Sequence, residues 1–319
     1  MVSKVSLWRS TPPAIFPVVL GFMGLSLAWR NVSYISPIPE EIGDLLLGIS
    51  TAYFIFFAAS YFAKGLRRPK AILDDLKMPP ARAGVAAFPM AIMLLAAALL
   101  PLGVQAREVW WIGVVVYYVA TALVAYSIIT GSPDARKFSP FQYLAFVGPI
   151  VGPVAGIPLG YVTESFWLAL AAMVPYIAIT FGYGAKLVRV RPPVPLRPSL
   201  VIVLAPTSLF AMAFFQLEIM WAYTLFYWLS VALALVFLSI SLWLTSGGWT
   251  PIWGSFTFPI ATFINLQIMT LSAGQNTVAM TLMIAGFTIG TPLILYIVWK
   301  TSQAWISGGL AKKTAASIA

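Results

Sequence analysis

Apolar stretches of about 20 residues alternate with short polar connections along the whole chain. At about 1.5 Å of rise per residue, a helix of this length crosses a hydrocarbon core about 30 Å thick. The pattern predicts an all-α integral membrane protein with ten transmembrane helices that form one transmembrane channel domain over residues 1–319. The expected helices lie near residues 12–30, 40–64, 83–102, 107–130, 140–160, 163–188, 198–216, 218–245, 250–272 and 276–301.

A proline recurs in the first helix of each consecutive pair, which divides the ten helices into five hairpins. Proline removes a backbone donor and clashes with the carbonyl four residues earlier, so within a membrane it needs a neighbouring group or a water-filled cavity. An odd number of equally oriented hairpins favours a ring around an axis normal to the membrane. We therefore expect a quasi-five-fold ring with odd-numbered helices inside and even-numbered helices outside. The expected kinks are at Pro17, Pro89, Pro149, Pro206 and Pro259.

Composition and charge agree with a membrane protein and predict its orientation. Hydrophobic residues make up 61% of the chain and charged residues 9%, with a mean hydropathy of +0.92. Of the 19 lysines and arginines, all but Arg30 and Arg107 fall on the side of the two termini. The positive-inside rule makes this side cytoplasmic, in a plasma membrane or the inner membrane of a bacterium or archaeon. The net charge of +10 thus reflects orientation, and no basic domain remains to bind nucleic acid.

The chain contains no cysteine and no histidine. Thiol chemistry, haem or zinc ligation by these residues and histidine-based catalysis are therefore absent, so we expect no enzyme, no catalytic residue, no cofactor and no metal site. Charged residues also avoid the middle of every expected helix, whereas proton-coupled carriers and voltage sensors need them there. Passive, voltage-insensitive conduction fits this pattern best. A carrier that binds its ion through carbonyls of broken helices remains an alternative, as does a non-transporting membrane scaffold.

Three of the proline-bearing helices contain distinctive apolar motifs: FPVVLGFMGLSLAW at 16–29, IVLAP at 202–206 and SFTFP at 255–259. Their order and spacing, with ten helices in five hairpins, resemble the tellurite-resistance/dicarboxylate transporter (TDT) family. That family includes the bacterial tellurite-resistance protein A and the slow anion channels of plant guard cells. The resemblance covers nearly the whole chain and implies a homotrimer in the lipid bilayer, each subunit having its own pore through five inner helices.

The resemblance also implies a gate. In that family a phenylalanine of the ninth helix plugs the pore, and the matching position is Phe258, with Phe256 as the second choice. A large apolar ring in a narrow pore would strip an ion of water that the wall does not replace. The residues alone favour a packing role for this ring, and the resemblance reverses that preference. The expected pore-lining positions are Phe16, Phe88, Gly148, Ala205, Phe256 and Thr262.

The permeant ions that the resemblance implies are small inorganic or carboxylate anions. The family also contains carriers for C4-dicarboxylates and sulfite, so a secondary carrier for these or for tellurite-related anions stays open. Selectivity has little support from the residues themselves, because freed carbonyls attract cations. Basic residues at the cytoplasmic mouth could concentrate anions there: Lys64, Arg67, Arg68, Arg136, Arg189 and Arg191. The polar candidates on the ninth helix, which could hydrate an ion or bind neighbouring helices, are Ser255, Thr257, Thr262, Asn265 and Gln267.

Overall fold

The computed structural model describes residues 6–104, 106–274 and 276–319, and every regular element in this part of the chain is a helix. Nine of the described helices are long and apolar enough to cross a membrane, and a further apolar segment, Tyr143–Gly156, is shorter. Lys4, one of the basic residues behind the predicted orientation, lies outside the described residues. The all-helical membrane fold is thus confirmed, with a shorter segment in place of the expected fifth helix.

The long helices follow the expected boundaries closely. They are α1 (Phe16–Val32), α2 (Glu40–Arg67), α4 (Pro79–Leu99), α5 (Arg107–Thr130), α7 (Val162–Arg189), α8 (Leu204–Gln216), α9 (Met220–Ser239), α11 (Gly254–Ser272) and α12 (Thr277–Ile306). The short ones are α3 (Pro69–Asp75), α6 (Gly152–Gly156), α10 (Ser241–Thr245) and α13 (Gly309–Lys313). Four long helices are extended by 3-10 helices. η2 (Pro13–Ile15) precedes α1, η7 (Val194–Val203) precedes α8, η8 (Pro251–Trp253) precedes α11, and η3 (Leu100–Leu102) follows α4. The expected helix over 218–245 is divided, because α9 ends at Ser239 and α10 follows Ile240.

Burial separates the long helices into two groups. In the most apolar window of each span, 83% of the residues are buried for α1 and α8, 78% for α11 and 61% for α4. The same fraction is between 22% and 33% for α2, α5, α7, α9 and α12. The second group exposes large apolar side chains such as Phe181, Trp221 and Trp299, which is the surface that hydrocarbon requires. Inner and outer helices therefore alternate along the chain.

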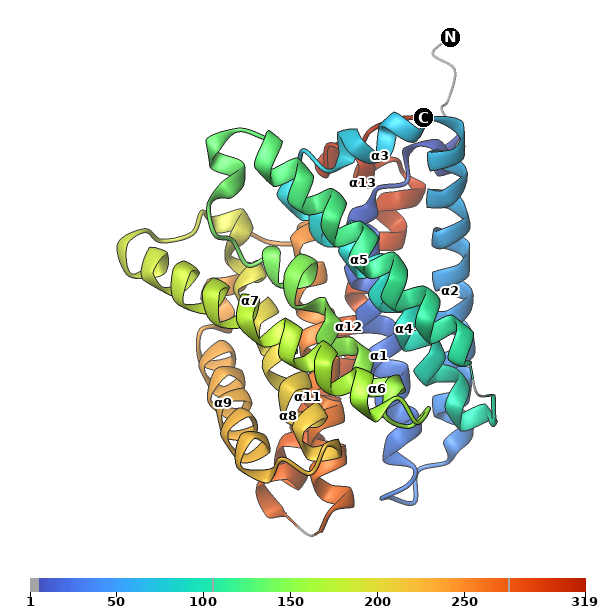
Figure 1. Ribbon diagram of the computed structural model, residues 1–319, viewed down its shortest axis with the longest axis vertical. Helices are drawn as coiled ribbons and strands as arrows, with labels where there is room; N and C mark the ends of the chain where they lie inside the picture. Colours follow the sequence, from blue (N-terminus) through green and yellow to red (C-terminus); the bar gives the residue numbers. More distant parts are fainter. Residues whose placement is uncertain (1–5, 105, 275) are drawn as a thin grey trace.

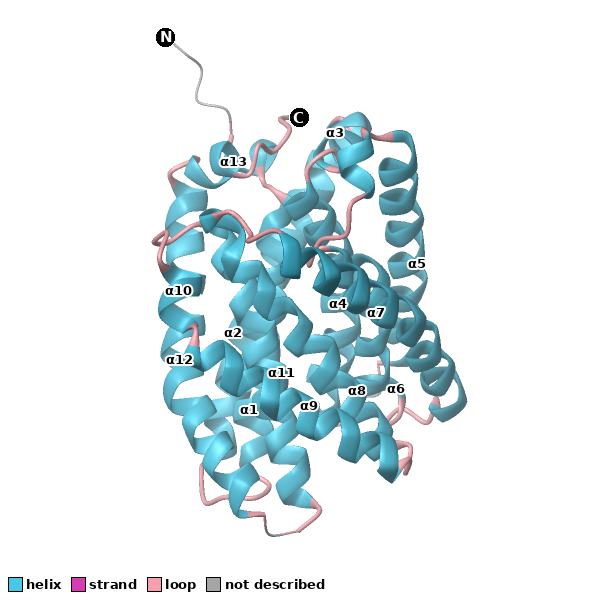
Figure 2. Cartoon of the chain, turned by 90° about the vertical axis from the view of Figure 1, so that its left-hand side faces the viewer, coloured by secondary structure: helices cyan, strands magenta, loops and turns pink. Residues whose placement is uncertain are grey.

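The inner segments contact one another in a closed circuit. Helix α1 packs against α4 and α11, α11 packs against α8, and the segment 143–156 lies between α4 and α8. Figure 1 shows the C-terminus at one end of the molecule, together with α3 and α13, and Figure 2 shows the same arrangement from the side. The first described residues lie at this end too, since the Ala319 backbone N–H donates to the Arg9 carbonyl at 3.0 Å. We call this the terminal end. The connections α1–α2, α8–α9 and α11–α12 lie at the opposite end.

The segment 143–156 is irregular because its sequence disfavours a continuous α-helix. It runs through a π-helical turn, η5 (Tyr143–Val147), a 3-10 turn, η6 (Gly148–Val151), and then α6. Two prolines, Pro149 and Pro153, remove backbone donors, and three glycines in the segment have low helix propensity. The glycines lie every four residues and face large side chains of the outer helices α5 and α7, at Gly148, Gly152 and Gly156.

Side chains of α5 supply the hydrogen bonds that this irregular backbone lacks. The Tyr117 hydroxyl donates to the Leu144 carbonyl at 3.0 Å, and Thr121 Oγ1 donates to the Ala145 carbonyl at 2.9 Å. Ala145 is four residues before Pro149, so its carbonyl is the one that this proline leaves without a helical donor. Trp110 Nε1 donates to the carbonyl of Gly152 at 2.9 Å. An apolar environment demands such internal partners, since water is not available there.

Candidate functional site

Two cavities lie between the inner segments, one toward each end of the molecule. The terminal-end cavity has a volume of about 60 Å³ and is lined by Pro17, Gly148, Ala205, Pro206 and Pro259 among others. The opposite-end cavity is larger, about 340 Å³, and its lining includes Gly24, Leu94, Val154, Met212 and Thr262. All five inner segments contribute to both cavities. The proline-bearing segments therefore enclose the central space of the fold.

Phe258 and Leu209 line both cavities, so these two side chains lie between them. Phe258 is 6% exposed and Leu209 3%. Across from Phe258, α1 presents Gly24, where an added Cβ would lie 3.5 Å from Phe258 Cδ2. A glycine at this position lets the phenylalanine ring pack directly on the backbone of α1. Apolar side chains thus separate the terminal-end cavity from the opposite-end cavity.

Hydrogen bonds between α1 and α11 fix the backbone around Phe258. Thr257 Oγ1 donates to the Pro17 carbonyl at 3.0 Å. Asn265 Nδ2 donates to the Gly24 carbonyl at 2.9 Å, and Asn31 Nδ2 donates to Asn265 Oδ1 at 3.1 Å. Pro259 has no backbone N–H, so it donates no helical hydrogen bond to the carbonyl of Ser255, a residue that lines the terminal-end cavity. The ring of Phe258 is therefore held by a rigid, hydrogen-bonded helix pair.

The structure distributes the predicted pore-lining residues unevenly. Gly148 and Ala205 line the terminal-end cavity and Thr262 lines the opposite-end cavity. Phe16 and Phe88 instead pack against each other, with ring centroids 5.0 Å apart. The Phe16 ring also contacts Tyr61 of the outer helix α2, at 5.6 Å. Phe256 lies edge-on to Trp253, with centroids 5.7 Å apart, and is 6% exposed.

The five predicted kink prolines occupy three kinds of position. Pro89 and Pro259 lie inside α4 and α11. Pro17 is the second residue of α1 and Pro206 the third of α8, where the missing N–H has no helical acceptor to leave unpaired. Pro149 lies in the 3-10 turn η6. Each proline therefore marks a change in helix type or a helix interior within an inner segment.

The polar candidates on α11 divide between the cavities and the helix contacts. Ser255 lines the terminal-end cavity and Asn265 the opposite-end cavity. Thr257 is fully buried against α1, and Gln267 accepts a hydrogen bond from the Tyr227 hydroxyl of α9 at 3.1 Å. Thr262 Oγ1 donates to the carbonyls of Phe258 and Pro259, both at 3.0 Å. Ser255, Thr262 and Asn265 thus line the cavities, whereas Thr257 and Gln267 bond neighbouring helices.

Among the described residues, no side chain that lines either central cavity is charged. At the opposite end, Arg30 is 6% exposed and forms ion pairs of 2.8 Å with Glu40 and with Asp44. Its guanidinium also lies over the ring of Tyr34, which lines the opposite-end cavity. The carboxylates compensate the arginine charge, so the central space is electrically neutral along its walls.

At the terminal end, Lys64 differs from its predicted role as a mouth residue. Its side chain is 0% exposed, and Nζ donates to Asp75 Oδ2 at 2.7 Å and to the Thr11 carbonyl at 3.1 Å. The Tyr61 hydroxyl also donates to Asp75 Oδ2, at 3.3 Å. A buried, paired ammonium does not attract ions from solution, so Lys64 is structural. This pairing was not predicted, because only the fold of α3 against α2 brings Asp75 to Lys64.

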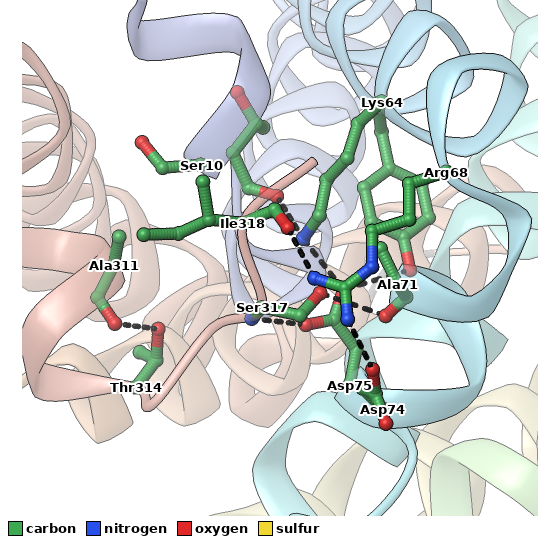
Figure 3. Close-up of polar contacts among 12 residues, drawn as sticks. Ser10, Lys64, Arg68, Ala71, Asp74, Asp75, Ala311, Thr314, Ser317 and Ile318 are labelled. Carbon is green, nitrogen blue, oxygen red and sulfur yellow. Dashed lines mark hydrogen bonds and ion pairs between the residues drawn. The ribbon is translucent and has the colours of Figure 1, made fainter. Parts of the chain in front are cut away.

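The last residues of the chain pack beside this ion pair (Figure 3). The Ser317 backbone N–H donates to Asp75 Oδ1 at 2.8 Å, and Ser317 Oγ donates to the Ala71 carbonyl at 2.7 Å. Arg68 Nη1 donates to the Ile318 carbonyl at 2.7 Å. On the neighbouring Asp74, the hydrogen bond from Lys77 lowers the pKa of the carboxyl. Thr314, at the start of this C-terminal segment, lines the terminal-end cavity.

This geometry places two cavities with uncharged linings, with Phe258 and Leu209 between them, inside an apolar helical shell. Residues 10–302 match the family of voltage-dependent anion channels, SLAC1. The chain belongs to this family. No curated protein matches the chain. As an anion channel family member, the protein is a multi-pass membrane transporter and not an enzyme, and the resemblance seen in its sequence motifs is confirmed.

Two residues that line the central cavities were not predicted from the sequence. Leu209 separates the two cavities together with Phe258, yet a leucine in an apolar helix carries no distinguishing signal. Asn31 lines the opposite-end cavity from the last turn of α1. A lone asparagine near a helix end reads as an ordinary cap or turn residue. Only the packing of α1 against α11 brings it to Asn265.

Proposed function

We propose that this chain conducts small anions passively through a neutral pore along the two central cavities, and that Phe258 is its gate. The observation that carries the proposal is that Phe258 lines both cavities and so lies between them. An ion that passes a buried phenyl ring loses hydration that the apolar wall does not replace. Leu209 would narrow the same level from α8. The cavity walls carry no positive charge that would select anions, so the proposed anion selectivity rests on the family match.

The pore is proposed to run through a quasi-five-fold ring of five hairpins, with odd-numbered segments inside and even-numbered ones outside. The closed circuit of contacts among α1, α4, the segment 143–156, α8 and α11 supports this arrangement. The lining of both cavities by all five segments supports it too. Neutral walls and the lack of an arginine row support conduction without a voltage sensor in this chain.

We infer that the terminal end faces the cytoplasm of a plasma membrane, or of the inner membrane in a bacterium or archaeon. The excess of lysine and arginine on the side of both termini supports this orientation. We also infer a homotrimer, with one pore in each subunit, from the likeness of the sequence motifs to the TDT family. Chemical cross-linking in native membranes tests the trimer, and a ladder that ends at a monomer or dimer contradicts it.

The gate is tested by anion flux into proteoliposomes for Phe258→Ala, with Phe256→Ala as matched control. Both phenylalanines are on α11 and both are 6% exposed, but only Phe258 lines the cavities. We expect Phe258→Ala to raise chloride and nitrate flux about tenfold, the effect of lowering a barrier by about 1.4 kcal/mol. Phe256→Ala should leave flux near wild type. Unchanged flux through folded Phe258→Ala protein, or an equal rise in both variants, contradicts the gate.

Passive conduction is separated from coupled transport by reversal potentials. A channel for chloride, nitrate or malate gives a current that reverses at the Nernst potential of that anion. A coupled carrier gives saturable uptake, and its reversal shifts with the gradient of a second ion. A shift with pH or sodium in the Phe258→Ala protein would therefore favour a carrier over the proposed channel.

A further inference from the structure

A third cavity, of about 190 Å³, lies away from the central passage. It is bounded by the start of α4, the end of α5, the connection 135–142 and the end of α7. All four of these belong to the terminal end of the molecule. Because α5 and α7 are outer helices, the cavity lies at the periphery, where the terminal-end surface of the bilayer would meet the protein. Its volume exceeds the roughly 30 Å³ that one water occupies, so it has room for a polyatomic ion.

Three basic side chains line this cavity: Arg82 of α4, Lys137 of the connection and Lys186 of α7. Among the described residues that line it, none is acidic. The remaining lining combines Ser139 and Gln142 with apolar side chains. Arg82 and Lys186 together place two positive charges in a partly enclosed space, which favours an anion because low-dielectric walls strengthen the field inside.

Arg82 is the most informative of the three. Arg82 is 6% exposed, and its Nε donates a hydrogen bond to the Leu76 carbonyl at 2.6 Å. Of the three basic residues buried in the described part of the chain, Arg30 and Lys64 have carboxylate partners, whereas Arg82 has carbonyl partners only. A buried guanidinium is costly unless an opposite charge compensates it. An anion in the adjoining cavity would provide that charge.

The other walls of the cavity are held in place. Phe138 packs against Gly182 of α7, and Lys186 Nζ donates to the Phe138 carbonyl at 3.4 Å. The Gln142 side chain accepts from the Ser139 backbone N–H at 3.1 Å. These contacts fix the connection 135–142 against α7, so the cavity is preformed. An aliphatic wall from Val124 and Ile128 adjoins the basic groups, which suits a ligand with an apolar part.

We propose that this cavity binds a phosphate group, supplied either by the headgroup of an anionic lipid or by free phosphate. Arginine presents several donors in a planar fork that matches phosphate oxygens, and the lysine adds a second charge. Basic pockets between helices on the cytoplasmic side of membrane proteins suit lipid headgroups for the same reason. The site is separate from the central passage, and binding is measured without reference to transport.

The test uses full-length protein in detergent and the variant Lys186→Gln, which changes an exposed side chain and should fold normally. The matched control is Arg189→Gln, an exposed cation on the same helix that does not line the cavity. Native mass spectrometry measures binding of phosphatidylglycerol against phosphatidylcholine. Thermal unfolding measures stabilisation by inorganic phosphate against chloride at equal ionic strength.

We expect Lys186→Gln to weaken phosphate-group binding about tenfold and Arg189→Gln to leave it near wild type. Preference for phosphatidylglycerol without stabilisation by inorganic phosphate identifies the lipid headgroup as the source. Stabilisation by inorganic phosphate that Lys186→Gln abolishes identifies free phosphate. Equal effects of both variants, or no preference for either probe over phosphatidylcholine and chloride, overturn the proposal. Arg82→Gln, if it folds, should lose binding entirely.

Discussion

Gly21 sets how closely α1 and α11 approach each other. A Cβ at this position would overlap the Thr257 side chain and lie 2.6 Å from the Phe258 backbone nitrogen. Backbone cannot yield as a flexible side chain does, so Gly21→Ala should force the helices apart and destabilise the protein by about 1–3 kcal/mol. Thermal unfolding in detergent measures the effect.

The control for this change is Gly48→Ala on α2, where an added Cβ meets no atom within 4 Å. Alanine favours the helix over glycine, so we expect a neutral effect or a gain of about 0.5–1 kcal/mol. If Gly21→Ala unfolds at the same temperature as Gly48→Ala, the close approach of α1 and α11 does not matter for stability.

The buried ion pair of Lys64 and Asp75 makes a second prediction at the scale of single residues. Asp75→Asn leaves the Lys64 ammonium, 0% exposed, without its counter-charge. Such an uncompensated charge should cost about 3–5 kcal/mol of unfolding free energy. The matched change Asp74→Asn removes a carboxylate whose partners are exposed, and it should cost less than about 1 kcal/mol. Chemical denaturation compares the two variants, and similar losses would argue against a structural role for the buried pair.

The segment 143–156 shows how an outer helix supports an inner one. Because Tyr117 and Thr121 of α5 donate to two carbonyls of this segment, the pair of changes Tyr117→Phe and Thr121→Val should leave both carbonyls unpaired. Each should cost about 1–3 kcal/mol. Thr130→Val is the control, since that hydroxyl bonds only the carbonyl of Tyr126 in its own helix. Equal unfolding temperatures for the double variant and wild type would mean that water satisfies the carbonyls instead.

At the scale of elements, proline spacing predicted which helices are buried but not how each is built. The alternation of inner and outer helices follows from apolar length and repeated prolines, both of which are visible in the sequence. The short fifth segment was not expected, because an apolar run near 140–160 has the length of a span. Its π and 3-10 turns depend on donors from Tyr117 and Thr121, which only tertiary packing brings close.

The candidate site was predictable only in part, for a related reason. The family motif around Pro259 led to Phe258, which lies between the cavities. Phe16 and Phe88 were expected to line the pore because they occupy equivalent positions in the repeat. Their rings instead pack against each other and against Tyr61 and Phe54 of the outer helix α2. Similar positions in a repeat therefore face different neighbours, since each hairpin packs against a different part of the molecule.

At the scale of the whole molecule, the connections between helices lie at two opposite ends, so the orientation of the protein in the membrane can be tested by labelling one end. The chain lacks cysteine, so a single introduced thiol is the only labelling site. Ser132, after α5, lies at the terminal end, and Ser272, the last residue of α11, at the opposite end; both are exposed. A membrane-impermeant maleimide added to intact cells should label Ser272→Cys and spare Ser132→Cys until the membrane is opened. The reverse pattern would invert the inferred orientation.

The lodged C-terminal segment has a practical consequence for recombinant work. Residues 314–319 run past the terminal-end cavity, and Ser317 and Ile318 are tied to Asp75, Ala71 and Arg68. An affinity tag or fluorescent reporter fused after Ala319 would pull on a segment that contacts both the buried Lys64–Asp75 ion pair and the wall of the terminal-end cavity. Expression yields and conductance from C-terminally tagged protein would then reflect the fusion as well as the channel.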